Sequence, residues 1–240
     1  MAITRVKNYN IAPYYDDFDE SKNYHRVLFR PGFAVQAREL TQLQTALQSQ
    51  VDKLGQYNFN DGSRVVGGKV SINTEYDFIK LTSTSSVSAF VGTTITGGTN
   101  GVTAEVLEAI AATGSDPDTL YIKYTNSGTN NATLLFANGE TISNGSKSAT
   151  LASSSATGKG SRVSIEEGAY FISGTMAYVA SQSMILDKYT NTPNYIIGLS
   201  VTESLVESGT DSTLVDNATG TPNFAAPGAH RYKIATALIK

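Results

Sequence analysis

The most regular pattern of hydrophobic and polar positions lies between residues 33 and 54. Large apolar side chains recur there every seven residues, and further apolar side chains stand at adjoining positions of the same face. This period matches one face of an α-helix and predicts a helix over residues 32–56, ended by Gly55. The apolar face is a candidate oligomer or assembly interface and consists of Phe33, Leu40, Leu43, Leu47, Val51 and Leu54.

The other face of this predicted helix is polar but almost uncharged. Glutamine, threonine and serine fill it, and only Arg38, Glu39, Asp52 and Lys53 carry charge. A helix face in free contact with water normally interleaves Glu and Lys. We therefore expect the polar face to be at least partly covered.

Two structures explain the seven-residue repeat. In one, the helix lies on a sheet of its own chain, and in the other it forms a short coiled coil through the axis of a homo-oligomer. Three heptads are barely enough for a coiled coil, and Gln36 and Gln50 occupy the second core position. Both alternatives stay open, and both hold if each face of the helix serves one contact.

Residues 1–31 carry aromatic side chains without any helical or strand period. Such side chains must be buried against other surface, so the segment predicts an extended arm that docks on the chain's own body or on a neighbour. The candidate docking residues are Tyr9, Tyr14, Tyr15 and Phe18.

Beyond residue 57 the pattern changes to short apolar or alternating runs separated by Gly, Asn and Asp. These runs predict antiparallel strands, with hairpin turns at Glu167-Gly168 and Gly174-Thr175. The predicted fold class is mainly β with one long N-terminal α-helix, an antiparallel β-sandwich or meander with an inserted small β-hairpin domain. The runs are 64–71, 76–81, 162–165, 169–173, 176–180, 184–189, 195–205 and 230–239.

Between residues 82 and 157 the composition shifts toward Ser, Thr and Gly, and only seven side chains are charged. The segments 92–99 and 139–146 align at an offset of 47, and each leads into a strand-like run. This predicts a small β domain over 82–157 built from a hairpin used twice, inserted into a main β domain of residues 57–81 and 158–240. No turn follows Ile239, as expected for the N-terminal part of a longer polypeptide.

Composition narrows the function classes. The chain carries a net charge of −3 with 16% charged residues, so neither nucleic acid nor a membrane surface is an expected partner. It contains no Cys and hence no disulfide, thiol nucleophile or thiolate metal site. No run approaches the length of an apolar membrane span, and the N-terminus has no signal-peptide core.

The histidines and the first acidic cluster give little support to catalysis or metal binding. His25 and His230 lie in no nucleophile motif, and each is expected to be held by a local hydrogen bond. The cluster of Asp16, Asp17, Asp19 and Glu20 lacks the spacing of a calcium loop. It favours local turns or ion pairs with Lys22 or Arg26.

A second set of carboxylates, Glu166, Glu167 and Asp187, is compatible with glycoside hydrolysis only if two of them lie about 5–10 Å apart. The sequence offers no support for that separation. We therefore predict no catalytic residue, no metal and no cofactor.

Four segments resemble the virion proteins of tailed bacteriophages, of the cyanophage and myovirus type, that form baseplates or tail fibres. The resemblance covers nearly the whole chain and is most specific near the N-terminus. The segments are Tyr14–Asp19, Arg30–Gln44, Glu166–Phe171 and Ala226–Tyr232, together with the repeated Gly-x-Thr-Ile-Thr/Ser unit.

This resemblance implies a structural protein of the virion rather than an enzyme, made in the host cytoplasm and incorporated in the phage tail. It implies other tail or baseplate proteins as partners and favours a homotrimer, with the apolar helix face at its axis. The alternative is a receptor-binding module that binds a host surface glycan or degrades a polysaccharide.

Overall fold

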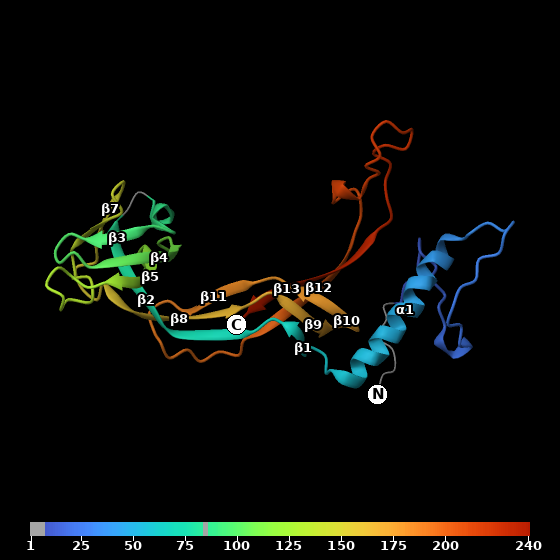
Figure 1. Ribbon diagram of the computed structural model, residues 1–240, viewed down its shortest axis with the longest axis horizontal. Coiled ribbons are helices and arrows are strands. Elements are labelled where there is room, and N and C mark those ends of the chain that lie inside the picture. The colour runs from blue at the N-terminus through green and yellow to red at the C-terminus, as the bar shows by residue number, and fades with distance from the viewer. Residues whose placement is uncertain (1–7, 84–85) are drawn as a thin grey trace. The chain divides into compact units, whose positions relative to one another are not determined.

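The computed structural model describes residues 8–83 and 86–240 and confirms a mainly β fold with one long helix and antiparallel sheets (Figure 1). The chain divides into two compact units. Unit 1 holds the described residues up to Lys69 with 165–182 and 199–237, and unit 2 holds 70–164, 183–198 and 238–240.

The described helices are one α-helix and three short 3-10 helices, η1 (Glu20–Lys22), α1 (Ala37–Asn58), η2 (Val87–Phe90) and η3 (Ser212–Leu214). The described strands are β1 (Arg64–Gly67), β2 (Val70–Ser83), β3 (Thr94–Gly97), β4 (Thr103–Ile110), β5 (Thr119–Asn126), β6 (Thr141–Ser143), β7 (Ser148–Leu151), β8 (Thr157–Ile165), β9 (Gly168–Ile172), β10 (Thr175–Val179), β11 (Gln182–Asp187), β12 (Gly198–Val206) and β13 (Arg231–Ile239).

Helix α1 begins and ends later than its apolar period predicts. A capping box sets the start, because the backbone N–H of Gln36 donates to Glu39 Oε2 at 2.8 Å. The predicted stop at Gly55 is wrong, since the helix continues to Asn58. Gly55 has a different role: a Cβ at this position would overlap the ring of Phe171 on β9. The glycine allows close contact between helix and sheet.

Unit 1 contains a three-stranded sheet in the order β1-β9-β10 and a two-stranded sheet of β12 and β13. Strands β9 and β10 form a hairpin whose turn residues, Ser173 and Gly174, both have positive φ, which confirms the turn predicted there. The hairpin predicted at Glu167-Gly168 is wrong. Strand β8 pairs with β2 and β11 rather than with β9, so the chain changes sheets at this point.

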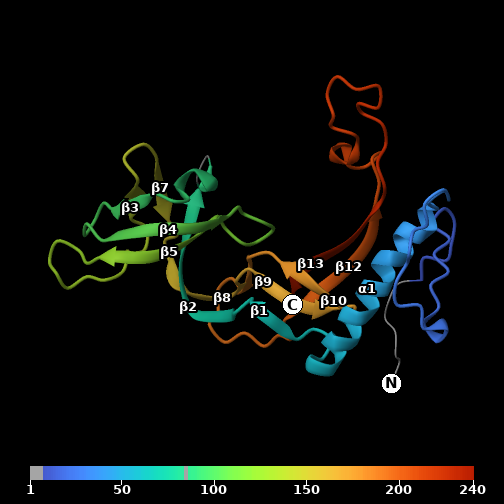
Figure 2. The ribbon, with the colours of Figure 1, turned by 45° about the vertical axis from the view of Figure 1, so that its right-hand side comes forward.

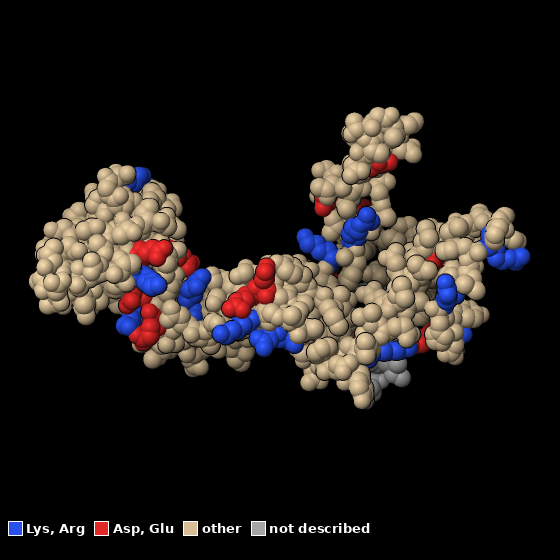
Figure 3. Space-filling view, in the orientation of Figure 1, with Lys and Arg blue, Asp and Glu red and all other residues tan. Residues whose placement is uncertain are grey.

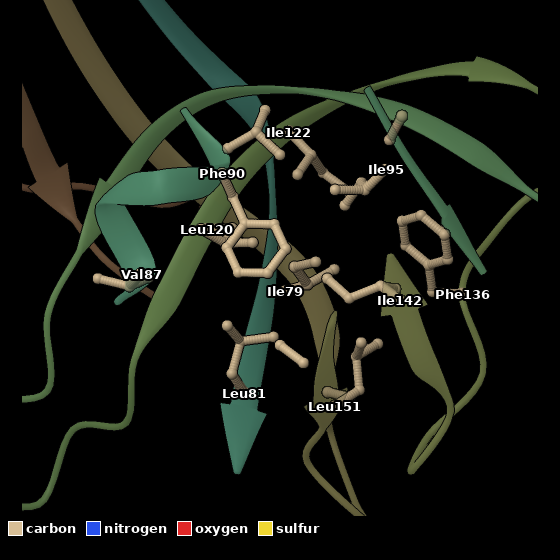
Figure 4. Close-up of a cluster of buried hydrophobic side chains, with 14 of the residues drawn as sticks. Ile79, Leu81, Val87, Phe90, Ile95, Leu120, Ile122, Phe136, Ile142 and Leu151 are labelled. Carbon is tan, nitrogen blue, oxygen red and sulfur yellow. The ribbon is translucent and has the colours of Figure 1, made fainter. Parts of the chain in front are cut away.

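Unit 2 contains an eight-stranded sheet in the order β11-β8-β2-β5-β4-β3-β6-β7. Because β2 also pairs with β7, the strands from β2 to β7 close into a ring. Apolar side chains from β2 to β7 and from η2 fill its interior, as Figure 4 shows. Unit 2 extends beyond the predicted 82–157 on both sides, since β2 and β8 continue past the ring.

The two predicted repeat segments form hairpins, β3–β4 and β6–β7, that pair with each other. Thr96 on β3 lies opposite Ser143 on β6, its own equivalent at the offset of 47. A local twofold relation therefore passes through this pair. Its equivalent isoleucines, Ile95 and Ile142, are both fully buried in the ring. The repeat thus supplies one core from two copies of a simple unit.

A buried carboxylate joins the two hairpins. Glu140 Oε1 accepts the backbone N–H of Ala137 at 2.6 Å, and its Oε2 accepts the N–H of Thr99, beyond β3, at 3.1 Å. Glu140 is 5% exposed. Buried backbone donors need such acceptors, because an unpaired one costs free energy.

Replacing Glu140 with alanine should lower the free energy of unfolding of unit 2 by about 2–4 kcal/mol, because two backbone donors lose a charged acceptor. Urea denaturation measures this change. Glu105→Ala is the matched control, since Glu105 is exposed on β4. Equal stability of the two variants would show that Glu140 does not hold the hairpins together.

Replacing Gly55 with alanine should destabilise unit 1 by about 1–3 kcal/mol, because the new methyl group overlaps Phe171 in a packed contact. This is the reverse of the usual gain from Gly→Ala within a helix. Gly209→Ala makes the same chemical change where the nearest heavy atom is 3.8 Å away and should be nearly neutral. A stabilised Gly55→Ala variant would contradict the described packing.

Candidate functional site

Helix α1 buries its small and polar side, contrary to the usual behaviour of an amphipathic helix. The fully buried positions of the helix are Thr45, Ser49, Asp52 and Gly55. Successive residues turn by about 100° around a helix axis, so Ser49 lies almost opposite Leu47. The polar face is partly covered, as expected, and the residues that cover it belong to the same chain.

Several contacts hold this buried side. Thr45 Oγ1 donates to Asp16 Oδ2 of the arm at 2.5 Å, and Gln48 Nε2 donates to Thr175 Oγ1 on β10 at 2.9 Å. Asp52 leaves room only for glycine at position 174, where a Cβ would lie 2.6 Å from its Oδ1. The buried residues of the helix are small, so the helix lies close to both the arm and the sheet.

The apolar side of α1 faces away from these contacts. All six residues of the predicted interface are exposed, although Phe33 lies before the first residue of the helix. The exposed fraction is 65% for Phe33, 63% for Leu47 and 62% for Leu54. Leu40, Leu43 and Val51 are exposed as well. The alternative in which this face packs on a sheet of its own chain does not hold in the structure.

The exposed apolar surface is larger than the sequence pattern predicts. Tyr57, at 89% exposure, lies two heptads after Leu43 and extends the same face, a signal that was present in the spacing. Tyr24 and Leu28 of the arm are also exposed. Large exposed apolar patches on a protein surface typically mark places where another molecule binds.

The arm of residues 8–35 runs beside α1 (Figures 1 and 2). Its acidic residues are engaged by side chains of the helix or by a turn of the arm. Asp17 pairs with Arg38 at 3.0 Å, Glu20 pairs with Lys53, and Asp19 caps η1. The partners predicted for this cluster, Lys22 and Arg26, are replaced by side chains of the helix.

The start of the arm docks on the beginning of β13. Tyr9 and Tyr232 meet edge to face at 6.2 Å between ring centroids. The hydroxyl of Tyr14 lies 2.6 Å from Nδ1 of His230, so this histidine has a partner 216 residues away rather than a local one. Of the other predicted docking residues, Phe18 is half-buried and Tyr15 is exposed.

Burial raises the pKa of Tyr9 and of Tyr232 above the ordinary value, and the nearby carboxylate of Glu203 raises each pKa further. Both phenols therefore hold their protons more tightly in the folded chain. Their contribution to stability is complete below the ordinary tyrosine pKa of 10.0 and is lost as pH rises through their raised values. Docking of the arm should weaken only in strongly alkaline solution.

Two of the three carboxylates considered for glycoside hydrolysis accept hydrogen bonds from tyrosine hydroxyls. Glu167 accepts from the hydroxyl of Tyr178 at 3.3 Å, and Asp187 accepts from that of Tyr195 at 2.8 Å. Glu166 and Glu167 belong to unit 1 and Asp187 to unit 2. His25 lies in the exposed part of the arm. Among the described residues, no cluster of His, Asp and Glu is suited to a metal ion.

The fold and this surface define a two-unit, mainly β protein with an exposed apolar helix face. A family model described as "Domain of unknown function (DUF4815)" matches residues 12–116 and 122–240, and the chain belongs to this family. No curated protein and no solved structure matches the sequence. Within the described part of the chain, no helix is both long and apolar enough to cross a membrane.

Replacing Asp16 with alanine should loosen the arm, because its buried carboxylate accepts from both Thr45 and the backbone N–H of Phe18. We expect trypsin to cleave after Lys22 or Arg26 about tenfold faster than in the unchanged protein. Asp19→Asn is the control, since asparagine also caps a helix. Unchanged cleavage of the Asp16 variant would show that this contact does not fix the arm.

Proposed function

We propose that this protein is a non-enzymatic structural component of a phage tail, a baseplate or tail-fibre anchoring protein that acts through assembly. The observation that supports this proposal is the exposed seven-residue repeat on α1. An isolated chain would leave this apolar face in water, whereas an assembly would bury it. The phage context rests on the resemblance of the N-terminal and C-terminal segments to tail proteins.

A second copy of the same helix is the partner that best fits this face. Leu40, Leu47 and Leu54 take the first core position of consecutive heptads, and Leu43 and Tyr57 take the second in two of them. Sequences with this 3.5-residue period pack knobs into holes with helices of the same kind. The core positions from Leu40 to Tyr57 extend about 26 Å along the helix.

The resemblance favours three copies around the axis, with the arm and unit 2 available to other tail proteins. The polar residue Gln50 interrupts the core, and a polar residue at such a position fixes register and oligomer state at a cost in stability. We therefore propose a homotrimer located in the virion, with other tail or baseplate proteins as further partners. Neither a cofactor nor a nucleic acid takes part.

Replacing Leu40, Leu47 and Leu54 together with serine should convert the oligomer into monomers, because it removes the apolar core of the proposed interface. Light scattering after size exclusion should give three times the chain mass of 25.5 kDa for the unchanged protein and the single-chain mass for the variant. The control is Leu134→Ser with Leu135→Ser, which alters exposed leucines of unit 2. A monomeric unchanged protein at high concentration would contradict the proposal.

The location in a tail is tested separately with antibodies against the purified chain. Negative-stain electron microscopy of phage particles carrying this protein should show label at the tail or baseplate. Label confined to the capsid, or found only on material outside the particles, would rule out the proposed location even if the chain is an oligomer.

A further inference from the structure

Unit 1 exposes two segments of opposite charge, and among the described residues only Glu207 of their charged side chains has an ion-pair partner, His230 at 3.6 Å. The first is arm segment 21–35, which contains Lys22, Arg26 and Arg30 and no acidic residue. The second, here called the lobe, is the turn-rich segment 207–228 between β12 and β13, which contains Glu207, Asp211 and Asp216 and no Lys or Arg.

The arm and α1 enclose a groove beside the basic segment. Its volume is about 350 Å³, within the range of roughly 300–1,000 Å³ that is typical of binding pockets. Apolar groups from Phe18, Tyr24 and Val27 line it together with the cations of Lys22 and Arg26. Two carboxylates also line it: Asp17, which is paired with Arg38, and Asp19, which caps η1. Within the described residues, neither of these two cations forms an ion pair.

Backbone hydrogen bonds hold the lobe in a defined conformation. Gly228 N–H donates to Leu214 O, and Asp216 N–H donates to Ala226 O, each at 2.9 Å. Val215 and Pro227 form an isolated β-bridge. Phe224 of the lobe is 54% exposed. The lobe therefore presents one aromatic side chain on an acidic stem.

The lobe and the groove of one chain are not joined in the structure. Among the described residues, no hydrogen bond, ion pair or ring contact links segment 210–228 with segment 21–35. In Figure 3 the basic atoms of the arm and the acidic atoms of the lobe lie on separate projections. The cations Lys22 and Arg26 of the groove are nevertheless opposite in charge to Asp211 and Asp216 of the lobe, and both surfaces carry aromatic groups.

We propose that the lobe of one copy docks in the arm groove of a second copy, with Phe224 against the apolar wall and the acidic stem against Lys22 and Arg26. Such a contact joins two different surfaces, so it closes into a ring when the copies surround a common axis. This inference rests on the self-association in the proposed function. It adds a contact that would link neighbouring chains outside the helical core.

Opposite charges across an interface mainly guide the encounter and fix its register, whereas the buried aromatic side chain contributes to affinity. Removing the two cations should therefore weaken the contact without dissolving the helical core. The effect should increase at low ionic strength, where exposed charges are less screened.

Cysteine cross-linking tests the contact directly, since the chain contains no Cys. A His25→Cys chain and an Asn223→Cys chain carrying different tags are co-expressed, which keeps Lys22, Arg26 and Phe224 intact. Mild oxidation should yield the mixed disulfide between the two tags. The yield should exceed by about tenfold that of Lys147→Cys in place of His25→Cys.

The matched charge test uses Lys22→Glu with Arg26→Glu in the His25→Cys chain. We expect about a tenfold lower yield of the mixed disulfide. Lys123→Glu with Lys147→Glu makes the same charge change on unit 2 and should leave the yield unchanged. Equal yields from both charge variants would overturn the role of Lys22 and Arg26.

A Gln50→Cys chain separates this inference from the proposed function, because it reports on the helical core. If Gln50→Cys cross-links with itself and the mixed disulfide does not form, the lobe contact is overturned and the helical oligomer stands. If only the mixed disulfide forms, the lobe contact stands and the helical core is overturned. Absence of both products overturns both.

Discussion

The whole arrangement of unit 1 depends on which side of α1 contacts the chain's own sheet. Phe171 occupies the space beside Gly55, and Asp52 occupies the space beside Gly174, so the small and polar side of the helix is the side that fits. A helix has only one opposite side, and here that side carries Leu40, Leu47 and Leu54. The exposure of the apolar repeat is thus a direct consequence of a close helix–sheet contact made by residues without bulk.

The arm stabilises α1 in this orientation, with its polar side inward, because it covers a further part of the helix with hydrogen bonds and ion pairs. Thr45, Arg38 and Lys53 each take one acidic residue of the arm, and Tyr9 and Tyr14 fasten its start to β13. The helix therefore has one face toward the sheet, one toward the arm and one apolar face left over. Unit 2 achieves its stability differently, by closing two paired hairpins around a core that includes Ile95 and Ile142.

The sequence predicts the elements of this fold better than their partners. The seven-residue period locates α1 and its apolar face, and the offset of 47 locates both hairpins. The sequence predicts a helix stop at Gly55, and this is wrong. A glycine is needed there because the ring of Phe171, 116 positions away, leaves no room for a Cβ. The partners of Asp17 and His230 were missed for the same reason: contacts between distant segments leave no local pattern. No period in the sequence says whether an apolar helix face turns inward or outward, because that depends on the opposite face.

We propose that copies of this chain cover the apolar face of α1. Hydrogen exchange of the unchanged protein, followed by mass spectrometry at low and high concentration, tests it most directly. We expect backbone amides of residues 40–54 to exchange at least about tenfold more slowly at high concentration, because association stabilises the helix against local opening. Amides of β5 in unit 2 should serve as the unaffected reference. Identical exchange of residues 40–54 at both concentrations would contradict the claim.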